Sequence, residues 1–255
     1  NTLTTLNIET LTGGTSDDVV TLGTQVTAGT IDLGSGDDTL VLGNFANTLT
    51  VLNIETLVGG SSADSVTLGT AVTSGTLDLG AGNDRLTLGD FANTLTASNI
   101  ESIMGGTSDD VVTLGTQVNG TVNLGAGDDT LQLGNFANSV TVQNIETVLG
   151  GNSNDTVTLG SQVTAGTIDL GSGEDTLILG NFANTVTLSN IETILGSSAN
   201  DVLTLATGMN GGTVNLGGGN DTLTLADVNN TLTVISVETL NGGTADDVVT
   251  LGAQI

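Results

Sequence analysis

The stretch LGSGDDTLVLG, residues 33–43, places two glycines and two adjacent aspartates directly before a short apolar run. Gly36 stands two residues before Asp38, and a glycine at such a position permits a positive φ in a tight turn. In the run that follows, Leu40 and Leu42 share one face, because side chains of a β-strand alternate with period two. The stretch therefore predicts a turn followed by a strand with one buried face.

Close copies of this stretch recur along the whole chain. The tripeptide Asn-Ile-Glu, with Ser-Val-Glu as its last variant, starts every 45 or 46 residues, at Asn7, Asn53, Asn99, Asn144, Asn190 and Ser236. Each repeat holds two related turns, one like GGTSDD (residues 13–18) and one like LGSGDD (residues 33–38). We expect residues 1–255 to be one repetitive segment, excerpted from a longer array, because both ends of the sequence match interior copies of the repeat.

The segments between the turns are rich in Val, Ile, Leu and Thr, alternate with period two, and show no helical period. Short strands and tight turns every 20 to 26 residues predict a solenoid, in which each coil lies on the previous one. We expect an all-β, right-handed parallel β-solenoid, a β-roll or β-helix, with two coils in each repeat of about 46 residues. A single coil of 46 residues is the alternative, but the same turn occurs twice in each repeat and favours two coils.

The composition excludes several classes of partner. The chain has a formal charge of -27, a single basic residue (Arg85), and neither His nor Cys. It therefore lacks the basic surface that nucleic acids or anionic membranes require. Thiolate and imidazole metal sites and disulfide bonds are excluded as well. No run of about 18 apolar residues is present, so we expect no membrane insertion.

The turns resemble the RTX, or haemolysin-type, calcium-binding nonapeptide G-G-x-G-x-D-x-U-x. The five closer copies, LGSGDDTLV, LGAGNDRLT, LGAGDDTLQ, LGSGEDTLI and LGGGNDTLT, differ from it in having Leu for the first Gly. The other turn is more degenerate: GGTSDDVV keeps the glycine pair and the aspartate but has Ser for the later Gly. The resemblance covers essentially the whole chain and implies a parallel β-roll in which motif aspartates and turn carbonyls on stacked coils bind Ca²⁺.

Carried over residue by residue, the resemblance implies eleven metal-ligating aspartates. In the closer copies, here called good turns, they are Asp38, Asp84, Asp129, Asp175 and Asp221. In the others, here called degenerate turns, they are Asp18, Asp64, Asp110, Asp155, Asp201 and Asp247. We expect each good turn to contact an ion, and the degenerate turns to complete the cage or to make only turn hydrogen bonds. Family motifs repeat every nine residues and load both edges of the roll, whereas spacings near 20 and 26 predict all eleven turns on one edge, with at most one column of ions.

Electrostatics favours a cation independently of the resemblance. Two unit charges about 5 Å apart repel by roughly 3 kcal/mol at an effective dielectric constant of 20, and a column of carboxylates repeats that cost at every step. Carboxylate and carbonyl oxygens are the ligands that suit Ca²⁺. The alternative is a metal-free turn, in which each aspartate accepts hydrogen bonds from the amides of its own turn.

Other recurring side chains have simpler interpretations. We expect solvent exposure for the acids beside the motif aspartates, which are Asp17, Asp37, Asp109, Asp128, Glu174 and Asp246. We expect an outward ladder on the strands from Asp32, Asp78 and Asp169. The glutamates of the tripeptide are expected in solvent or at a bend, with a ligand role as the alternative; they are Glu9, Glu55, Glu101, Glu146, Glu192 and Glu238. One phenylalanine per repeat is expected to fill a corner of the core rather than stack on a sugar, and the set is Phe45, Phe91, Phe136 and Phe182.

The repetition argues against catalysis, because an active site needs one asymmetric cluster whereas every carboxylate here recurs. Arg85 occupies a strand position held by Thr in sister repeats, so we expect a surface substitution. We expect a secreted, extracellular, calcium-stabilised scaffold of a bacterial surface layer, sheath, filament or adhesin stalk. Its expected partners are further copies of itself, or a cell-surface glycan. The alternatives are a β-helix carbohydrate-active enzyme and a glycan- or ice-binding solenoid that uses its threonine ladders.

Overall fold

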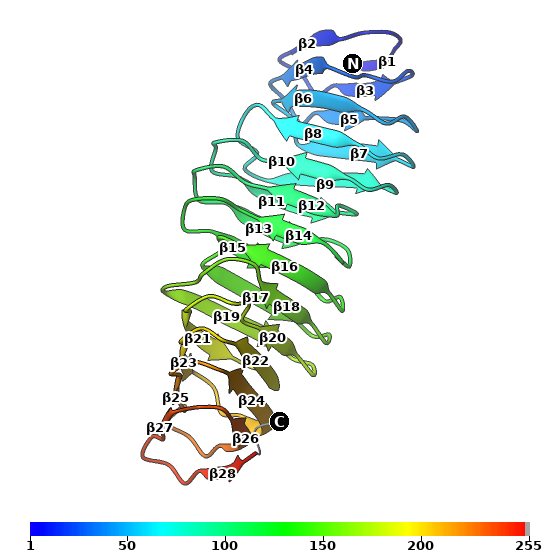
Figure 1. Ribbon diagram of the computed structural model, residues 1–255. Helices are drawn as coiled ribbons and strands as arrows, with labels where there is room; N and C mark the ends of the chain where they lie inside the picture. The colour runs from blue at the N-terminus through cyan, green and yellow to red at the C-terminus, as the bar shows by residue number, and fades with distance from the viewer. Residues whose placement is uncertain (253–255) are drawn as a thin grey trace. The chain divides into compact units, whose positions relative to one another are not determined.

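The computed structural model describes residues 1–252, and the chain divides into two compact units, Asn1–Asp129 and Thr130–Ile255. The secondary structure of the described residues consists of strands, turns and bends. No helix within residues 1–252 is long and apolar enough to span a bilayer. Each unit is built in the same way from short parallel strands (Figure 1).

The first unit contains strands β1 to β14. Their bounds are β1 Thr2–Thr5, β2 Thr10–Gly14, β3 Val19–Leu22, β4 Gly29–Gly34, β5 Thr39–Val41, β6 Thr48–Leu52, β7 Thr56–Gly60, β8 Ser65–Leu68, β9 Gly75–Gly80, β10 Arg85–Thr87, β11 Thr94–Ser98, β12 Ser102–Met104, β13 Val111–Leu114 and β14 Thr121–Asn123. The second unit contains strands β15 to β28. Their bounds are β15 Thr130–Gln132, β16 Ser139–Gln143, β17 Thr147–Gly151, β18 Thr156–Leu159, β19 Gly166–Gly171, β20 Thr176–Ile178, β21 Thr185–Ser189, β22 Thr193–Ser197, β23 Val202–Leu205, β24 Asn210–Gly217, β25 Thr222–Thr224, β26 Thr231–Ile235, β27 Thr239–Asn241 and β28 Val248–Leu251.

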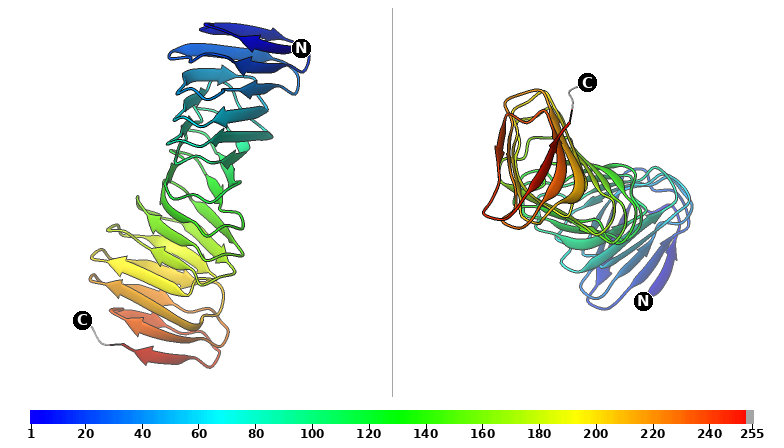
Figure 2. Two further views of the ribbon diagram at one scale, coloured as in Figure 1. Left: turned by 90° about the vertical axis from the view of Figure 1, so that its right-hand side faces the viewer. Right: turned by 90° about the horizontal axis from the view of Figure 1, so that it is seen from below.

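Within each unit a strand pairs in parallel with the strand two further along the chain, so odd-numbered strands form one sheet and even-numbered strands form the other. The two sheets lie on opposite sides of the coil (Figure 2). Paired residues are 17 to 21 positions apart: Val19 pairs with Thr39, for example, and Thr39 with Thr56. One coil is therefore one odd and one even strand with two turns, and the predicted all-β parallel solenoid is confirmed.

The 46-residue repeat contains two and a half coils rather than the expected two. Glu9, Glu55 and Glu101 occupy the same place in successive repeats and directly precede β2, β7 and β12, so one repeat advances by five strands. Since five is odd, each repeat begins in the opposite sheet from the one before it. The expectation counted only the aspartate turns, whereas the turns at Val26 and Asn47, which carry no aspartate, also lead into strands.

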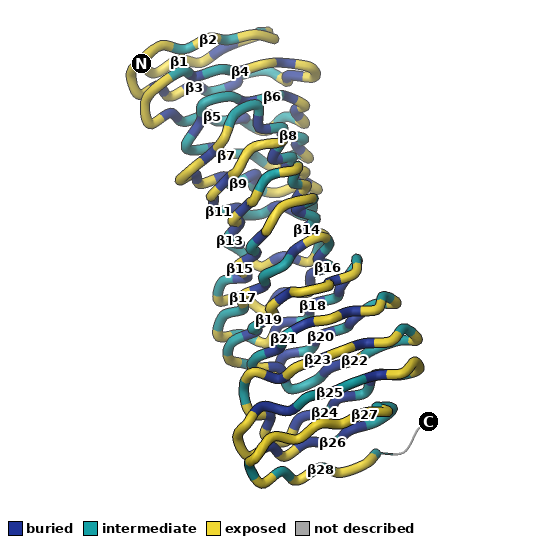
Figure 3. Tube along the Cα trace, turned by 90° about the vertical axis from the view of Figure 1, so that its left-hand side faces the viewer, coloured by how far each residue is buried: buried dark blue, intermediate teal, exposed yellow. Residues whose placement is uncertain are grey.

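Apolar side chains of both sheets fill the interior, and each stacks on the equivalent side chains of the coils before and after it. In the first unit Val20, Leu40, Leu57 and Leu77 are successive partners, and each is at most 4% exposed. Outward positions on the same strands carry Thr, Val, Asp or Gly, and buried and more exposed residues therefore alternate along each strand (Figure 3). Backbone hydrogen bonds between coils and these stacked apolar side chains together hold the coils in register.

The phenylalanines do not fill the core, so that expectation was wrong. Phe91 and Phe136 are 37% and 36% exposed. A Cβ built on Gly43, which has φ of +70°, would lie 3.3 Å from two ring carbons of Phe45. The ring therefore covers the glycine of its own turn at the surface, because aliphatic side chains already fill the narrow space between the sheets.

Two turn positions require special backbone conformations. Gly34 has φ of +91°, and a Cβ there would lie 2.1 Å from the carbonyl oxygen of Gly14 in the adjacent coil. Asn53 has φ of +52°, and its Nδ2 donates a hydrogen bond of 2.7 Å to Asp32 Oδ1 in the preceding coil. Asp32 lies on the outward side of β4, as predicted, but its strand partners are Thr12 and Leu52. The expected ladder of Asp32, Asp78 and Asp169 was wrong, because none of these aspartates pairs with another aspartate.

The alternation of inward and outward side chains predicts unequal effects for two neighbours on β20. Leu177 is fully buried and Ile178 points outward. Leu177→Ala should cost about 2–5 kcal/mol through lost burial and a cavity, whereas Ile178→Ala should cost less than about 1 kcal/mol. Native-state hydrogen exchange in β18, β20 and β22 measures both losses, and equal costs would contradict the assignment of faces.

Candidate metal site at the aspartate turns

The turns of a coil lie at two edges. Within each unit, edge A denotes the turns that precede odd-numbered strands, and edge B the turns that precede even-numbered strands. In the first unit, Asp18, Asp38, Asp110 and Asp129 lie at edge A, while Asp64 and Asp84 lie at edge B. In the second unit, Asp155, Asp175 and Asp247 lie at edge B, while Asp201 and Asp221 lie at edge A.

The expectation that all eleven turns share one edge was therefore wrong. A separation of 19 or 20 residues is one coil, and it stacks a degenerate turn directly on a good turn. A separation of 26 residues, as from Asp38 to Asp64, spans three strands and so crosses to the other edge. The aspartates form separate stacked pairs and not one column.

A hydrogen bond joins the two aspartates of each pair. The backbone N–H of the degenerate-turn aspartate donates to Oδ1 of the good-turn aspartate in the next coil. The five pairs and their N···O distances are Asp18 to Asp38, 2.7 Å; Asp64 to Asp84, 2.6 Å; Asp110 to Asp129, 2.7 Å; Asp155 to Asp175, 2.6 Å; and Asp201 to Asp221, 2.8 Å. The metal-free alternative placed these hydrogen bonds within one turn, whereas the structure places them between coils.

Each pair is extended by one polar residue on either side. At edge B of the first unit, the backbone N–H and Nδ2 of Asn47 donate to Asp64 Oδ1 at 2.8 and 2.9 Å. On the far side, the N–H of Asp84 donates to Glu101 Oε2 at 2.8 Å. We call this series of Asn, Asp, Asp and Glu on four successive coils a polar ladder. Buried Val26, whose N–H donates to Asn47 Oδ1 at 3.0 Å, precedes the ladder.

Sequence reasoning missed both ends of the ladder. The asparagines received no role, yet those at the five interior copies are at most 3% exposed: Asn47, Asn93, Asn138, Asn184 and Asn230. The glutamates were expected in solvent or at a bend, but four accept the N–H of a good-turn aspartate: Glu55, Glu101, Glu192 and Glu238. The available signal was position, because Asn, Asp and Glu of the ladder each stand directly before a strand.

The ladder aspartates are buried acids with one unsatisfied oxygen. Asp38, Asp64 and Asp84 are at most 2% exposed. Among the described residues, Oδ2 lacks a hydrogen-bond partner in Asp38, Asp64, Asp84, Asp110, Asp155, Asp175, Asp201 and Asp221. Burying a charged oxygen without a partner is costly, so each pair requires either a proton or a cation.

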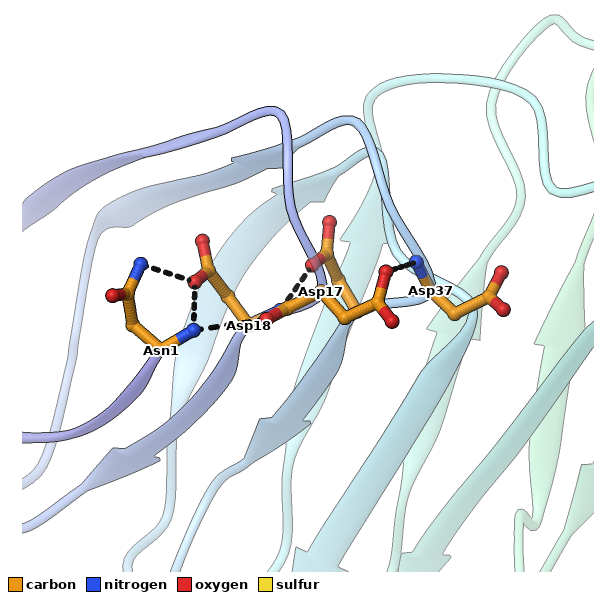
Figure 4. A network of polar contacts seen from close by, with 5 residues as sticks. Asn1, Asp17, Asp18 and Asp37 are labelled. Carbon is orange, nitrogen blue, oxygen red and sulfur yellow. Dashed lines mark hydrogen bonds and ion pairs between the residues drawn. The ribbon is translucent and has the colours of Figure 1, made fainter.

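The pKa of Asp84 and of Asp175 is raised to about 6, mainly by burial and in addition by neighbouring carboxylates, while a backbone amide of the adjacent coil opposes the shift. Burial also raises the pKa of Asp64, and hydrogen bonds from the backbone and side-chain amides of Asn47 oppose this shift. At the first pair, Asp18 Oδ1 accepts a hydrogen bond of 2.8 Å from Nδ2 of Asn1, the contact that Asn47 makes with Asp64 (Figure 4).

The acids beside the motif aspartates are exposed, as predicted. Figure 4 shows one contact between two of them: Asp17 Oδ1 accepts the backbone N–H of Asp37 in the next coil at 2.9 Å. Arg85 is exposed as well, in agreement with the expected surface substitution. These exposed side chains remain hydrated and do not raise the same demand for a counter-charge.

The pairs fit a hard cation. Their side-chain donors are carboxylate oxygens, the type of ligand that Ca²⁺ prefers. In the part of the chain that the structure describes, no three His, Cys, Asp or Glu side chains form a group able to hold a metal ion. A cation would therefore take its remaining ligands from main-chain carbonyls and water.

Comparison with known proteins decides the type of repeat. The family described as RTX calcium-binding nonapeptide repeat (4 copies) matches residues 30–49 and 76–95, which contain the good turns of Asp38 and Asp84. RTX-type calcium-binding repeats therefore occur in at least these two segments of the parallel solenoid. Calcium is the ion of these repeats, and the aspartate pairs would hold it.

Two further comparisons add nothing on function. No curated protein sequence matches the chain significantly. A solved structure described as a hyperactive, Ca²⁺-dependent, β-helical antifreeze protein from an Antarctic bacterium is 20% identical and aligns with 99% of this chain and 81% of its own. Its TM-score is 0.25, too low for the superposition to support any conclusion about this chain.

The raised pKa values predict an inverted pH dependence in the absence of divalent cations. Between the ordinary value of 3.8 and about 6, folded Asp84 and Asp175 hold protons that the unfolded chain has released. Stability should therefore fall as the pH rises through this window, and the melting temperature followed by circular dichroism should fall with it. The double variant Asp84→Asn/Asp175→Asn should flatten the profile, and a melting temperature of the unsubstituted chain that rises across the window would contradict the assignment.

Proposed function

We propose that the chain is a secreted structural scaffold, a stiff calcium-stabilised spacer in a bacterial surface layer, sheath, filament or adhesin stalk. The observation that carries this proposal is the equivalence of the sites. Ladders with the same contacts begin at Asn47, Asn138 and Asn184, so no position within them is chemically unique. A rod of equivalent coils can extend and bear load but offers no single centre for chemistry.

Calcium links the fold of this scaffold to its location. With a formal charge of -27, the chain repels itself, and each buried pair adds two carboxyl groups without a cationic side chain beside them. An ion that binds only the folded coils stabilises them by mass action. Such a chain would stay unfolded in a low-calcium cytoplasm and fold outside the cell, which suits export as an extended chain.

Self-association into a filament, sheath or lattice is part of the proposal. The outward faces of both sheets carry uninterrupted files of threonine; one consists of Thr39, Thr56, Thr76, Thr96 and Thr113. A uniform uncharged file repeats at the spacing of the coils, about 4.8 Å. It supports lateral packing of copies at many equivalent registers, without a unique complementary surface.

The threonine files also favour a second candidate function, binding of a periodic ligand such as a glycan or ice. Thr147, Thr167, Thr187, Thr204 and Thr224 form such a file in the second unit. A scaffold should show neither thermal hysteresis nor retention on a polysaccharide, so either result would favour the second candidate. An enzyme would instead degrade a polysaccharide. One substitution would then abolish this activity, while the equivalent substitutions in other repeats would have no effect.

Calcium binding at the pairs can be tested with a buried acid and a matched exposed one. Asp84→Asn should lower the number of bound calcium ions by about one and reduce the calcium-induced rise in melting temperature, because it removes a charged ligand. Asp90→Asn should change neither, since Asp90 is exposed and sister repeats have Asn44, Asn135 and Asn181 there. Isothermal calorimetry and circular dichroism measure both effects against chelator and against sodium at equal ionic strength. Identical melting of the unsubstituted chain in calcium and in chelator would overturn the calcium dependence.

A further inference from the structure

The two aspartates of a pair are held differently. In the ladder at edge A of the second unit, Asp201 Oδ1 accepts two hydrogen bonds from Asn184, from the backbone N–H at 2.9 Å and from Nδ2 at 3.0 Å. Asp221 Oδ1 accepts a single one, from the N–H of Asp201 at 2.8 Å. The same asymmetry recurs in the ladder of Asn47, Asp64 and Asp84.

Asn184 is itself fixed in place. Its Nδ2 also donates to the carbonyl oxygens of Phe182 at 2.8 Å and Leu179 at 3.1 Å, and its Oδ1 accepts the N–H of Val163 at 3.0 Å. With 1% of its surface exposed and both ends of the amide engaged, the side chain cannot rotate to offer its oxygen to an ion. The amide therefore presents N–H groups, and not an oxygen, toward the pair.

We propose that the ladder asparagines, Asn47, Asn93, Asn138, Asn184 and Asn230, are positioning residues that end the cation site on one side and confine it to two coils. This inference rests on the proposed calcium binding at the aspartate pairs. The N–H groups of Asn184 occupy Asp201 Oδ1 with hydrogen bonds and repel a cation. The ligands that remain for the ion are Asp201 Oδ2, the Asp221 carboxylate and turn carbonyls. A carboxylate in place of the amide would carry the acidic series onto a third coil.

The test substitutes the amide of one ladder by a carboxylate in the full chain. Asn184→Asp removes the Nδ2 donor and places a third carboxylate beside Asp201 and Asp221. Asn181→Asp makes the same charge change three residues away at an exposed position, where Asp90 stands in a sister repeat. Because Asn181 already accepts hydrogen bonds from Ser197 and Ser198 through its oxygen, the control keeps its contacts.

In chelator, Asn184→Asp should melt at a lower temperature than the unsubstituted chain, while Asn181→Asp should not. Calcium should raise the melting temperature of Asn184→Asp by more than it raises that of the unsubstituted chain or of Asn181→Asp. Calorimetry should show that the tightest site of Asn184→Asp binds calcium roughly tenfold more tightly than the tightest site of the unsubstituted chain, as expected for one further charged ligand. If Asn184→Asp fails to fold locally in chelator, recovery of its β signal with calcium at a lower concentration than the unsubstituted chain needs gives the same answer.

The outcomes separate this inference from the proposed function. A calcium response of Asn184→Asp that equals those of the unsubstituted chain and of Asn181→Asp would overturn the positioning role while leaving the calcium sites in place. Absence of any calcium response in the unsubstituted chain would overturn the proposed function, and with it the inference that rests on it. Asn47→Asp, at edge B of the first unit, repeats the test in an independent ladder.

Discussion

The rest of the structure depends on the hydrogen bond from the backbone N–H of one coil to a buried side-chain oxygen of the next. In the Asp64 to Asp84 step this bond measures 2.6 Å, and both side chains are at most 2% exposed. The turn amides of a solenoid cannot all be satisfied by strand pairing, so ladder side chains complete the set at the edges. The cost is a set of buried carboxyl groups, and in eight of those that the structure describes one oxygen lacks a hydrogen-bond partner.

This constraint explains why the acids occur in short series and not in a continuous column. Each ladder begins after an apolar residue such as Val72 and ends at a glutamate such as Glu101, so buried carboxyl groups occupy two successive coils and are then interrupted. A repeat of two and a half coils moves the next ladder to the opposite edge. Repulsion between ladders is thereby reduced, while each ladder keeps an aspartate pair suited to one divalent ion.

The fold class followed from the sequence because strand period and turn composition are local properties. The inward positions of Leu40 and Leu42 were assigned correctly for that reason. The number of coils per repeat could not be obtained from the aspartates alone, since turns without a carboxylate also begin strands. The roles of Asn47 and Glu101 depend on contacts between coils 17 residues apart, which become visible only once the register is known. The residues that directly precede the strands recur every 8 to 12 positions, and this spacing equals that of the turns.

The central claim is that cations sit at isolated aspartate pairs that alternate between two edges. Anomalous diffraction from crystals grown with calcium tests it most directly. Within the first unit, the account predicts ions at the Asp18/Asp38 and Asp110/Asp129 pairs on edge A and at the Asp64/Asp84 pair on edge B. An unbroken column of ions along one edge, or ions bound only to the exposed acids outside the ladders, would contradict it.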